Sequence, residues 1–599
     1  MSAEATVSTA VEPYEKIMAA NGKQPRPGQK QLILAGVGLH PGELVVCRAP
    51  TATGKSLGAL ITAGVRAQES GQRTVIATYT KLLQDQYALR GGESDLDLAE
   101  KLFPGVVFAV LKGANNYLCR TRAAKMKPPK VSQSNSVWNK FLLETGDPGE
   151  VKDHFGHNVL KRAAANWRTC GRHSPEECGY AAAKKRAREA DVVVTNHALV
   201  LINGQNPGVL GPHDLLIVDE VHNMAAAADD YGSEEFKPNW LGGSMDAVKF
   251  GEVVQAVFGP QGEERMPKVD EVASVIKFWK MLPQADRTRL AEARDWIEAA
   301  VANKRDLLGS ARLASVDWRD GEAMLRWRLV DTTPVTLAAL DGTMTIQQTP
   351  GHSDGDEVEF ERGVLLMSAT VGTPAAPVYA VERLLGPDAG EMVSYQELAS
   401  PLDYPGRMRV SLIEGPGVWG EKVYRLVKDV GGRTLVLMRS WKRVYEMEDA
   451  MVGAPVKVWV QDRESPANNH AVVEAFKADE TSVLIGTRSF FEGIDVPGPS
   501  LSQVVIGELP IPMAISPVDK ERQRRLGPQG WQKDVLIPQT AMGLEQQMGR
   551  LIRSPQDRGL VAILDGAAHS GWGWTAVSQA AEMYGGLTPR EAAVKWWRG

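Results

Sequence analysis

The chain of 599 residues is too long for one hydrophobic core, and its 43% hydrophobic and 24% charged residues are typical of a soluble globular protein with several domains. It has no apolar run long enough to cross a bilayer, no secretory signal pattern at its N-terminus and only four cysteines, which argues against a disulfide-stabilised secreted protein and predicts a cytoplasmic location. The formal net charge of −5 disfavours a generally basic nucleic-acid-coating protein but leaves room for a local basic groove.

Short β-branched runs alternate with longer helical patterns, which predicts an α/β fold with largely parallel sheets. The expected strands form two sets, separated by a Pro/Gly-containing joint at 401–408. The first set is 43–49, 73–80, 214–220 and 363–370, and the second is 433–440, 482–487, 503–510 and 560–565. Two α/β lobes are the simplest arrangement of these strands.

Two stretches interrupt the first lobe. Residues 103–190 contain three of the four cysteines and many Lys and Arg residues. Residues 231–325 carry apolar residues at three- and four-residue spacing, which predicts helices.

The segment APTATGKS (49–56) follows an expected strand and precedes a helical pattern, as a phosphate-binding loop does, with Ala49 where the strict pattern has glycine. Backbone N–H groups of such a loop and of the following helix cradle phosphates. Lys55 would reach the β- and γ-phosphates, and Ser56 would bind Mg²⁺. The alternative is a glycine-containing turn that happens to precede a lysine. The expected nucleotide-binding residues of the loop are Thr51, Ala52, Thr53, Gly54, Lys55 and Ser56.

An acidic pair ends the strand 214–220, in VDEVHN (218–223). Carboxylates at the carboxyl end of a strand suit metal chemistry in an α/β fold. We expect Asp219 to hold Mg²⁺ and Glu220 to polarise the attacking water. Taken alone, the pair would more often be a solvated loop.

Late in the second lobe, QQMGRLIR (546–553) has the form QxxGRxxR. Arg550 and Arg553 are expected to share one helix face and to stabilise the developing phosphate charge, and Gln546 to orient water. The alternative is a basic surface helix.

Together these motifs resemble the DinG/XPD-like branch of superfamily 2 helicases, over nearly the whole chain. Further segments that resemble this family appear in the family's order: RPGQKQ (26–31), ATYTKLLQDQY (77–87), NNYLC (115–119), ADVVVTNHALV (190–200), LLMSAT (365–370), TLVLMRSW (434–441) and GTRSFFEGIDVPG (486–498). The resemblance implies two RecA-like lobes with a cysteine-bearing cluster domain and a helical arch inserted in the first lobe. The implied segments are 1–102, 191–230 and 326–400 for the first lobe, 103–190 and 231–325 for the two insertions, and 401–599 for the second lobe.

The resemblance also implies ATP-driven movement along single-stranded DNA in the 5′→3′ direction, with duplex unwinding. An RNA–DNA hybrid as substrate and an accessory protein that uses ATP only as a switch stay open as alternatives. A fused N-terminal exonuclease is not expected, because 25 residues precede Arg26. By position, the implied roles are adenine contact for Arg26 and Gln29, coupling for Ser368 and Thr370, nucleotide or DNA proximity for Gly493 and Asp495, and backbone contact for Thr80, Gln84, Ser440 and Arg488. Trp441, Phe490 and Phe491 either stack on bases or pack in the core.

In the family, four cysteines of the first insertion bind a [4Fe–4S] cluster. The resemblance gives Cys119, Cys170 and Cys178 as three of these ligands. Cys47 lies in the strand before the phosphate loop and is expected to be a packing residue. His173 is a possible fourth ligand, and a cluster with three protein ligands, a zinc site and a metal-free insertion remain alternatives.

Overall fold

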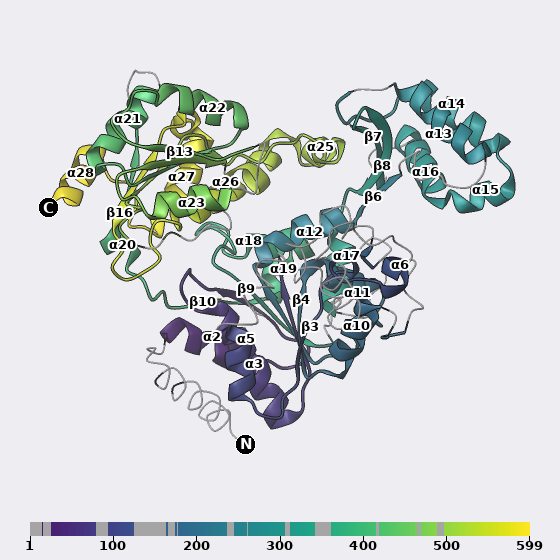
Figure 1. Cartoon of the computed structure of the whole chain (residues 1–599), viewed down its shortest axis with the longest axis horizontal. Helices are drawn as coiled ribbons and strands as arrows, with labels where there is room; N and C mark the ends of the chain where they lie inside the picture. Colours follow the sequence, from purple (N-terminus) through teal and green to yellow (C-terminus); the bar gives the residue numbers. More distant parts are fainter. Residues whose placement is uncertain are drawn as a thin grey trace, which may run out of the picture.

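Three bodies make up the computed structural model of the chain (Figure 1). The first lobe is the purple-to-teal body, the second lobe is green to yellow, and the arch is the outlying teal body. The structure describes residues 15, 19, 26–79, 94–124, 163–165, 174–176, 178–236, 245–259, 262–305, 312–341, 361–414, 419–463, 469–487, 496 and 498–599.

The first lobe is built on a seven-stranded parallel sheet in the order β10-β1-β9-β5-β2-β4-β3. Its strands are β1 (Leu44–Arg48), β2 (Thr74–Thr78), β3 (Phe108–Val110), β4 (Val192–Asn196), β5 (Leu215–Asp219), β9 (Gly363–Ser368) and β10 (Ser394–Glu397). The central strands are buried on both faces, which explains their continuous apolar sequences.

Helices cover both faces of this sheet. One apolar core joins it to α2 (Pro27–Val37), α3 (Lys55–Ser70) and α5 (Asp95–Leu102). A second core, on the other face, includes α10 (Gly179–Glu189), α11 (His197–Gln205), α12 (Met224–Tyr231), α17 (Thr333–Asp341) and α18 (Tyr379–Leu385). The short helices α6 (Arg120–Ala124) and α19 (Ala389–Met392) complete the described helices of the lobe. Because successive strand residues point to opposite faces, neighbours such as Val46 and Cys47 fall in different cores.

The second lobe has a six-stranded parallel sheet in the order β11-β16-β15-β12-β14-β13. Its strands are β11 (Met408–Leu412), β12 (Thr434–Met438), β13 (Val458–Val460), β14 (Val483–Thr487), β15 (Gln503–Ile506) and β16 (Gly559–Ile563). Its helices are α20 (Tyr404–Arg407), α21 (Trp419–Val430), α22 (Trp441–Ala450), α23 (Asn469–Lys477), α25 (Pro517–Trp531), α26 (Ile537–Met548), α27 (Gly571–Glu582) and α28 (Arg590–Arg598). The lobe therefore repeats the α/β plan of the first.

The arch combines helices with a small antiparallel sheet. Its helices are α13 (Met245–Phe258), α14 (Val269–Met281), α15 (Gln284–Arg289) and α16 (Ala291–Arg305), and its sheet β6-β8-β7 comprises β6 (Ser233–Phe236), β7 (Arg312–Arg319) and β8 (Glu322–Leu329). Large aromatic side chains, among them Phe250, Trp296 and Trp327, fill its core.

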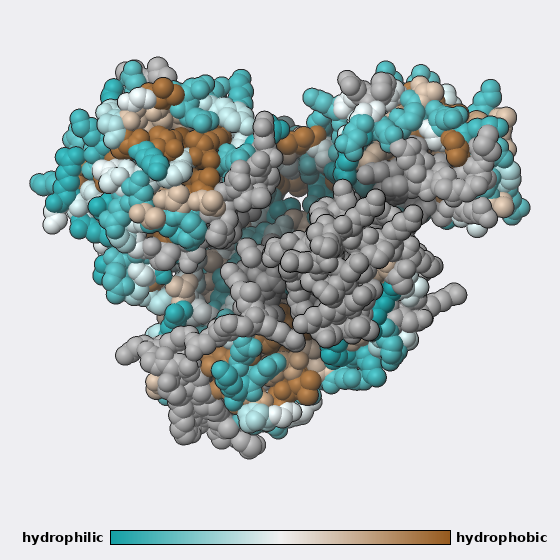
Figure 2. All heavy atoms as spheres, viewed as in Figure 1, coloured by the Kyte–Doolittle hydropathy of each residue, from teal (hydrophilic) through white to brown (hydrophobic). Residues whose placement is uncertain are grey.

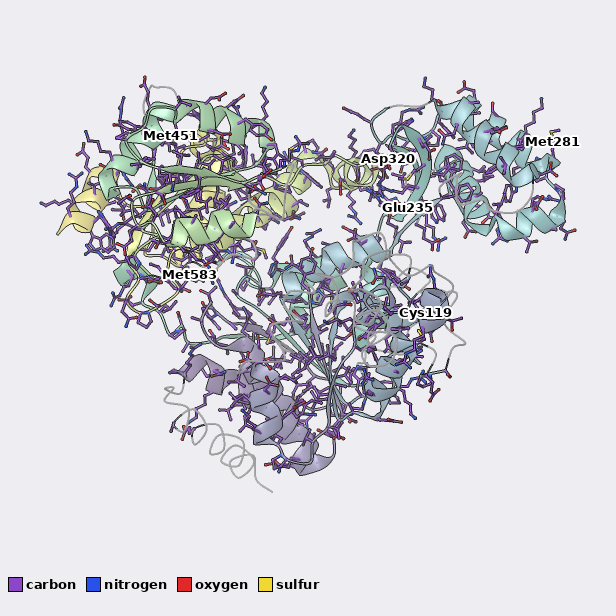
Figure 3. The ribbon with its side chains drawn as sticks, viewed as in Figure 1. Cys119, Glu235, Met281, Asp320, Met451 and Met583 are labelled. Carbon is purple, nitrogen blue, oxygen red and sulfur yellow. The ribbon has the colours of Figure 1, made fainter. Side chains whose placement is uncertain are left out.

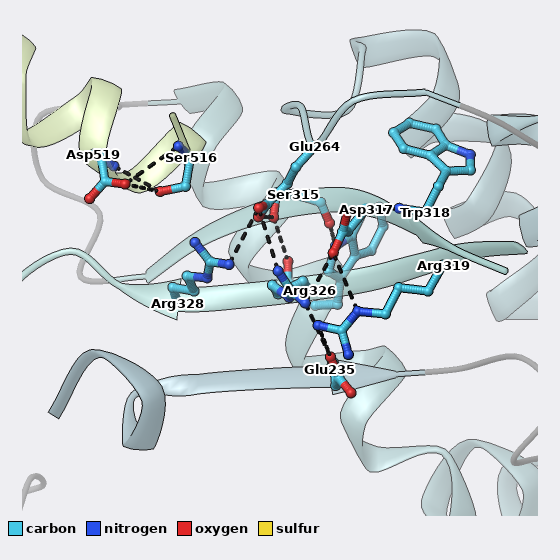
Figure 4. A network of polar contacts seen from close by, with 11 residues as sticks. Glu235, Glu264, Ser315, Asp317, Trp318, Arg319, Arg326, Arg328, Ser516 and Asp519 are labelled. Atoms are coloured by element: carbon cyan, nitrogen blue, oxygen red, sulfur yellow. Dashed lines mark hydrogen bonds and ion pairs between the residues drawn. The ribbon is translucent and has the colours of Figure 1, made fainter. Parts of the chain in front are cut away.

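A polar network lies on the small sheet (Figure 4). Arg326 is almost buried and forms ion pairs with Glu235 at 3.2 Å, Glu264 at 3.4 Å and Asp317 at 3.0 Å. Three carboxylates around one guanidinium compensate its loss of water. The α25 end of the second lobe reaches this sheet, since Arg522 donates to the carbonyl of Val330 and pairs with Asp229 of α12.

The structure confirms the α/β fold and the eight expected strands, although β15 ends at Ile506 rather than at residue 510. Five strands of the two lobes were not among those expected. Three of them, β3, β10 and β13, are three or four residues long and only partly buried, which leaves a weak apolar signal. The other two, β4 and β11, have five residues each and are mostly buried. The helical expectation for 231–325 holds for α13–α16 and is wrong for β6, β7 and the first half of β8, because residues 312–329 form a hairpin.

No helix in the described ranges is long and apolar enough to span a bilayer. On the face seen in Figure 2, apolar residues gather mainly over the second lobe, while the arch helices present mostly hydrophilic side chains. The arch sequence is thus amphipathic, with its aromatic residues turned inward.

Candidate nucleotide site and cysteine pair

The segment 49–56 forms a loop between β1 and the N-terminus of α3, as its sequence predicts. Gly54 caps α3 in the left-handed conformation (φ 82°), and a Cβ placed there would come within 2.7 Å of Gln29 Nε2, so glycine is required. Ala52 is also left-handed (φ 63°), whereas Ala49 is not among the described residues with positive φ. Alanine at position 49 therefore costs no left-handed strain, although the strict pattern has glycine.

Two side chains support the loop backbone: Arg26, the N-cap of α2, and Gln29, within α2. The Arg26 side chain donates to the carbonyl of Ala52 at 2.5 Å, and the buried Gln29 amide donates to the carbonyl of Gly54 at 2.8 Å. Both residues expected to contact adenine thus lie against the phosphate loop itself.

Lys55 faces the acidic pair at the end of β5. Its Nζ lies 3.2 Å from Glu220 Oε1. Burial alone would lower the pKa of Lys55, but the carboxylates of Glu220 and Asp219 hold it above its ordinary value. Burial would raise the pKa of Glu220, and the charges of Lys55 and His222 outweigh this and lower it. Both side chains are therefore charged at neutral pH.

From Glu220 a line of polar contacts runs to the second lobe. Ser368 Oγ, at the end of β9, donates to Glu220 Oε2 at 3.0 Å and lies 2.7 Å from His222 Nδ1. Two residues on, Thr370 Oγ1 accepts a hydrogen bond of 3.1 Å from Gln546 Nε2 in α26. The structure thus brings together candidates from three distant motifs, and adds His222, which sequence reasoning quoted within VDEVHN but did not single out.

Arg550 and Arg553 do not share a helix face, so that expectation is wrong. Helix α26 ends at Met548, and Arg550 and Arg553 follow it in a turn and an irregular segment. The carboxylate of Asp557 accepts from the N–H groups of Arg553 and Ser554, at 2.8 and 2.7 Å, which closes a turn instead of continuing the helix. Both arginines are partly buried beside the second-lobe core.

A cavity of about 430 Å³ lies between the lobes, next to the polar line. Its walls include His222, Tyr379 and Arg383 from the first lobe. Arg439 and Thr487, which follow and end strands of the second sheet, face it from the other side. Side chains of both lobes therefore line the cavity, and basic and hydroxyl groups are among them.

Of the residues expected to contact nucleic acid, the structure describes Ser440. It is exposed after β12 and caps α22, accepting from the Arg443 N–H at 3.4 Å. Trp441 is partly buried and lies beside Tyr445 with the two rings tilted, their centroids 6.1 Å apart. Several other residues that were expected near the nucleic acid or the nucleotide lie outside the described parts of the chain. They are Thr80, Gln84, Arg488, Phe490, Phe491, Gly493 and Asp495.

Two of the candidate cluster cysteines come together in the first lobe. Cys119 (labelled in Figure 3) and Cys178 are partners in an antiparallel bridge, and both are completely buried. Neighbouring backbone bonds hold them, such as Gly179 N–H to the carbonyl of Leu118 at 2.9 Å. Cys170 and His173 lie outside the described residues.

Cys47 cannot join this pair. It lies in β1 and belongs to the core on the α2–α3 face of the sheet, whereas Cys119 and Cys178 belong to the core on the opposite face. Burial raises the pKa of its thiol to about 12, as expected for a packing residue. Among the described residues, no group of three or more His, Cys, Asp or Glu side chains could hold a metal ion.

The chain is similar to known helicases in its second lobe and over most of its length. A helicase C-terminal domain family matches residues 423–578, within the second lobe. The ATP-dependent helicase DinG of Mycobacterium tuberculosis (strain ATCC 25177 / H37Ra) is 28% identical over 92% of this chain and 91% of its own length. The ATP-dependent DNA helicase YoaA of Haemophilus influenzae is 26% identical, over 92% of each chain. Over most of its length the chain is therefore similar to ATP-dependent helicases of the DinG and YoaA kind.

A solved XPD helicase structure has the same fold, with a TM-score of 0.54 at 14% identity, over 92% of this chain and 97% of that one. Some contacts of the site were not expected from the sequence, because no short motif reveals them. Tyr404 bonds through its hydroxyl to Thr51, and Arg48 pairs with Glu545 across the lobes. The only available signal was position, since Arg48 directly precedes the phosphate loop and Glu545 directly precedes Gln546.

Proposed function

We propose that this chain couples ATP hydrolysis to 5′→3′ movement along single-stranded DNA and thereby unwinds duplexes. The observation that carries the proposal is the polar line from Lys55 through Glu220 and Ser368 to Thr370 and Gln546, which crosses from one lobe to the other. A reaction at one end of such a line can change the relative position of the lobes at the other.

The nucleotide would bind with its phosphates on the loop 49–56 and the N-terminus of α3. Lys55 would hold the β- and γ-phosphates, and Glu220, ionised by its surroundings, would accept a hydrogen bond from the attacking water. Ser56 and Asp219 would hold Mg²⁺, which neutralises phosphate charge when bound.

The second lobe would supply the remaining groups. Arg550 and Arg553 would stabilise the charge of the transferring phosphoryl group. Gln546 would orient the attacking water, or would respond to its position through the hydrogen bond to Thr370. Gln546 lies in α26 and both arginines follow this helix, so all three belong to the second lobe and would reach the phosphates only when the lobes are closed.

The nucleic acid would cross both lobes. Ser440 and Arg488 of the second lobe and Thr80 and Gln84 of the first would hold the backbone, and Gly493 and Asp495 would lie near nucleotide and strand. Contacts to the backbone explain movement without strong sequence preference. The relatives named as DNA helicases favour DNA as the substrate, and an RNA–DNA hybrid is the alternative.

Cys119 and Cys178, with Cys170, would hold a [4Fe–4S] cluster, either with His173 as the fourth ligand or with three protein ligands alone. Two adjacent buried thiols are the soft ligands that Fe–S clusters and zinc prefer, so this half of the donor set fits. A bound cluster would cross-link the insertion that separates the first-lobe motifs. Zinc, or an insertion without metal, is the alternative.

The direct test is Glu220→Gln in the full chain. We expect this variant to bind ATP and single-stranded DNA but to lose DNA-stimulated hydrolysis, because the amide cannot act as a base. Wild-type protein that binds ATP and DNA yet hydrolyses nothing would instead identify an ATP-switched binding protein.

A further inference from the structure

A buried ion pair joins the two lobes beside the nucleotide site. Arg48 is the last residue of β1, and Glu545 lies in α26. Arg48 Nη2 is 2.9 Å from Glu545 Oε2, and the two side chains are only 6% and 2% exposed. Each residue directly precedes a nucleotide-site motif, the loop 49–56 in one lobe and Gln546 in the other.

Further contacts surround the pair. Arg48 Nη2 lies 3.9 Å from the sulfur of Met583, which Figure 3 labels at the edge of the second lobe that faces the first. The hydroxyl of Tyr584 donates to the carbonyl of Glu545 at 3.0 Å. The Tyr584 ring packs edge-on against Tyr404, whose hydroxyl bonds to Thr51 of the phosphate loop. The pair therefore belongs to one cluster that connects the loop with α26.

Stability alone does not account for this pair. Glu545 Oε1 and Arg48 Nε are buried without a hydrogen-bond partner among the described residues. Removing two charges from water is costly, and an ion pair that leaves some of its hydrogen-bonding atoms unsatisfied recovers only part of that cost. Apolar residues of the same size would stabilise the interface at least as well.

We propose that Arg48 and Glu545 form a positioning pair, which fixes α26 against the phosphate loop and so sets the closed arrangement in which Gln546, Arg550 and Arg553 meet the nucleotide. Neither residue touches the phosphates in this proposal, which rests on the proposed function. The pair acts through the elements that it joins. Its loss should therefore lower kcat for ATP hydrolysis, because the second-lobe groups act in the transition state, and leave the KM for ATP nearly unchanged.

The test compares wild type with Glu545→Gln and with the charge-swapped double variant R48E/E545R, all as full chains. We expect kcat of DNA-stimulated ATP hydrolysis to fall roughly tenfold in E545Q, with KM within about twofold, and to recover partly in the swapped protein. Asp229→Asn is the matched control, because it breaks another pair between the lobes, Asp229–Arg522, at the arch and away from the nucleotide site.

Hydrogen–deuterium exchange of the nucleotide-free proteins gives a second readout that does not depend on ATP hydrolysis. Backbone amides of 44–56 and 537–550 should exchange faster in E545Q, return toward wild type in R48E/E545R, and stay protected in D229N. The proposal would be overturned if E545Q had the same amide exchange and the same kcat as the wild type. It would also be overturned if R48E/E545R folded but recovered neither kcat nor protection from exchange. If the wild type hydrolyses no ATP, the proposed function fails, and the exchange data still decide this inference.

Discussion

The nucleotide site and the cysteine pair share the first lobe but are assembled in different ways. At the nucleotide site, contacts of 2.7 to 3.2 Å join Lys55, Glu220, His222, Ser368, Thr370 and Gln546, most of which follow the carboxyl ends of neighbouring parallel strands. Cys119 and Cys178 meet instead at an isolated bridge outside the sheet. The register of the sheet fixes the first site, whereas a few local hydrogen bonds fix the second.

Because the two sites are held in different ways, we expect a substitution in one of them to leave the other intact. Loss of a side chain at the sheet edge should stop the chemistry and leave the fold, since the backbone there is held by paired strands. Loss of a cysteine should change the insertion and leave the nucleotide site.

Replacing Lys55 with alanine should have the largest effect on the nucleotide side. We expect DNA-stimulated ATP hydrolysis to fall by about a hundred- to a thousandfold, because the partly buried Lys55 ammonium is the cation at the phosphate loop. Steady-state phosphate release measures this, with Lys101→Ala, an exposed lysine of α5, as the matched control. Unchanged turnover in K55A would remove the loop from the proposed site.

Cys119→Ser tests the other side of the comparison. We expect bound iron and visible absorbance to disappear, and unwinding to fall several-fold more than ATP hydrolysis, because the insertion loses its cross-link. Cys47→Ala should retain its iron, because Cys47 lies on the opposite face of the sheet. Equal iron loss in both variants would contradict the assignment, and zinc instead of iron in the wild type would select the alternative metal.

Ser368→Ala should have an intermediate effect. The substitution removes the hydroxyl that joins Glu220 to His222, so we expect kcat to fall about tenfold. Unwinding should fall further than hydrolysis, since the line of polar contacts from Glu220 to Gln546 passes through Ser368. Ser394→Ala, exposed on β10 of the same sheet, is the control, and equal behaviour of the two variants would remove Ser368 from the line.

The pH dependence of stability should show the smallest effect. Burial raises the pKa of Glu545 to about 7, although Arg48 offsets part of the rise; Glu397 raises it slightly, and Tyr584 and Tyr395 pack near the pair. The folded protein then holds a proton that the unfolded chain loses near its ordinary value of 4.5. This contribution to stability is present below pH 4.5 and is lost as the pH rises through about 7.

The thermal midpoint of wild type relative to E545Q should therefore decline between pH 5 and pH 8, by an amount equivalent to about 1–3 kcal/mol. A pH-independent difference between the two proteins would show that Glu545 does not titrate in this range.

The sequence predicted the parts of this molecule that local patterns encode. Central strands such as β5 are continuous apolar runs, and the phosphate loop needs a left-handed Gly54, so both were recognisable. The helix expected across Arg550 and Arg553 failed because the side chain of Asp557 captures the backbone after α26. The short edge strand β10 is only partly buried and carries almost no apolar signal.

The partners of distant residues could not be predicted. His222 meets a serine 146 residues away, and Arg48 meets a glutamate 497 residues away. Such contacts follow from the packing of whole lobes and not from any local pattern. The resemblance to the helicase family pointed to Cys119 and Cys178 as candidate ligands, whereas the backbone bridge between them is visible only in the structure.

The central claim is that this chain is an ATP-driven motor on single-stranded DNA. Strand displacement from a duplex with a 5′ single-stranded tail, beside the same duplex with a 3′ tail, tests it most directly. The account predicts that wild-type protein with ATP and Mg²⁺ displaces the strand of the 5′-tailed duplex, and that K55A displaces neither. Displacement from the 3′-tailed duplex alone would contradict the direction, and displacement by K55A at the wild-type rate would contradict the motor.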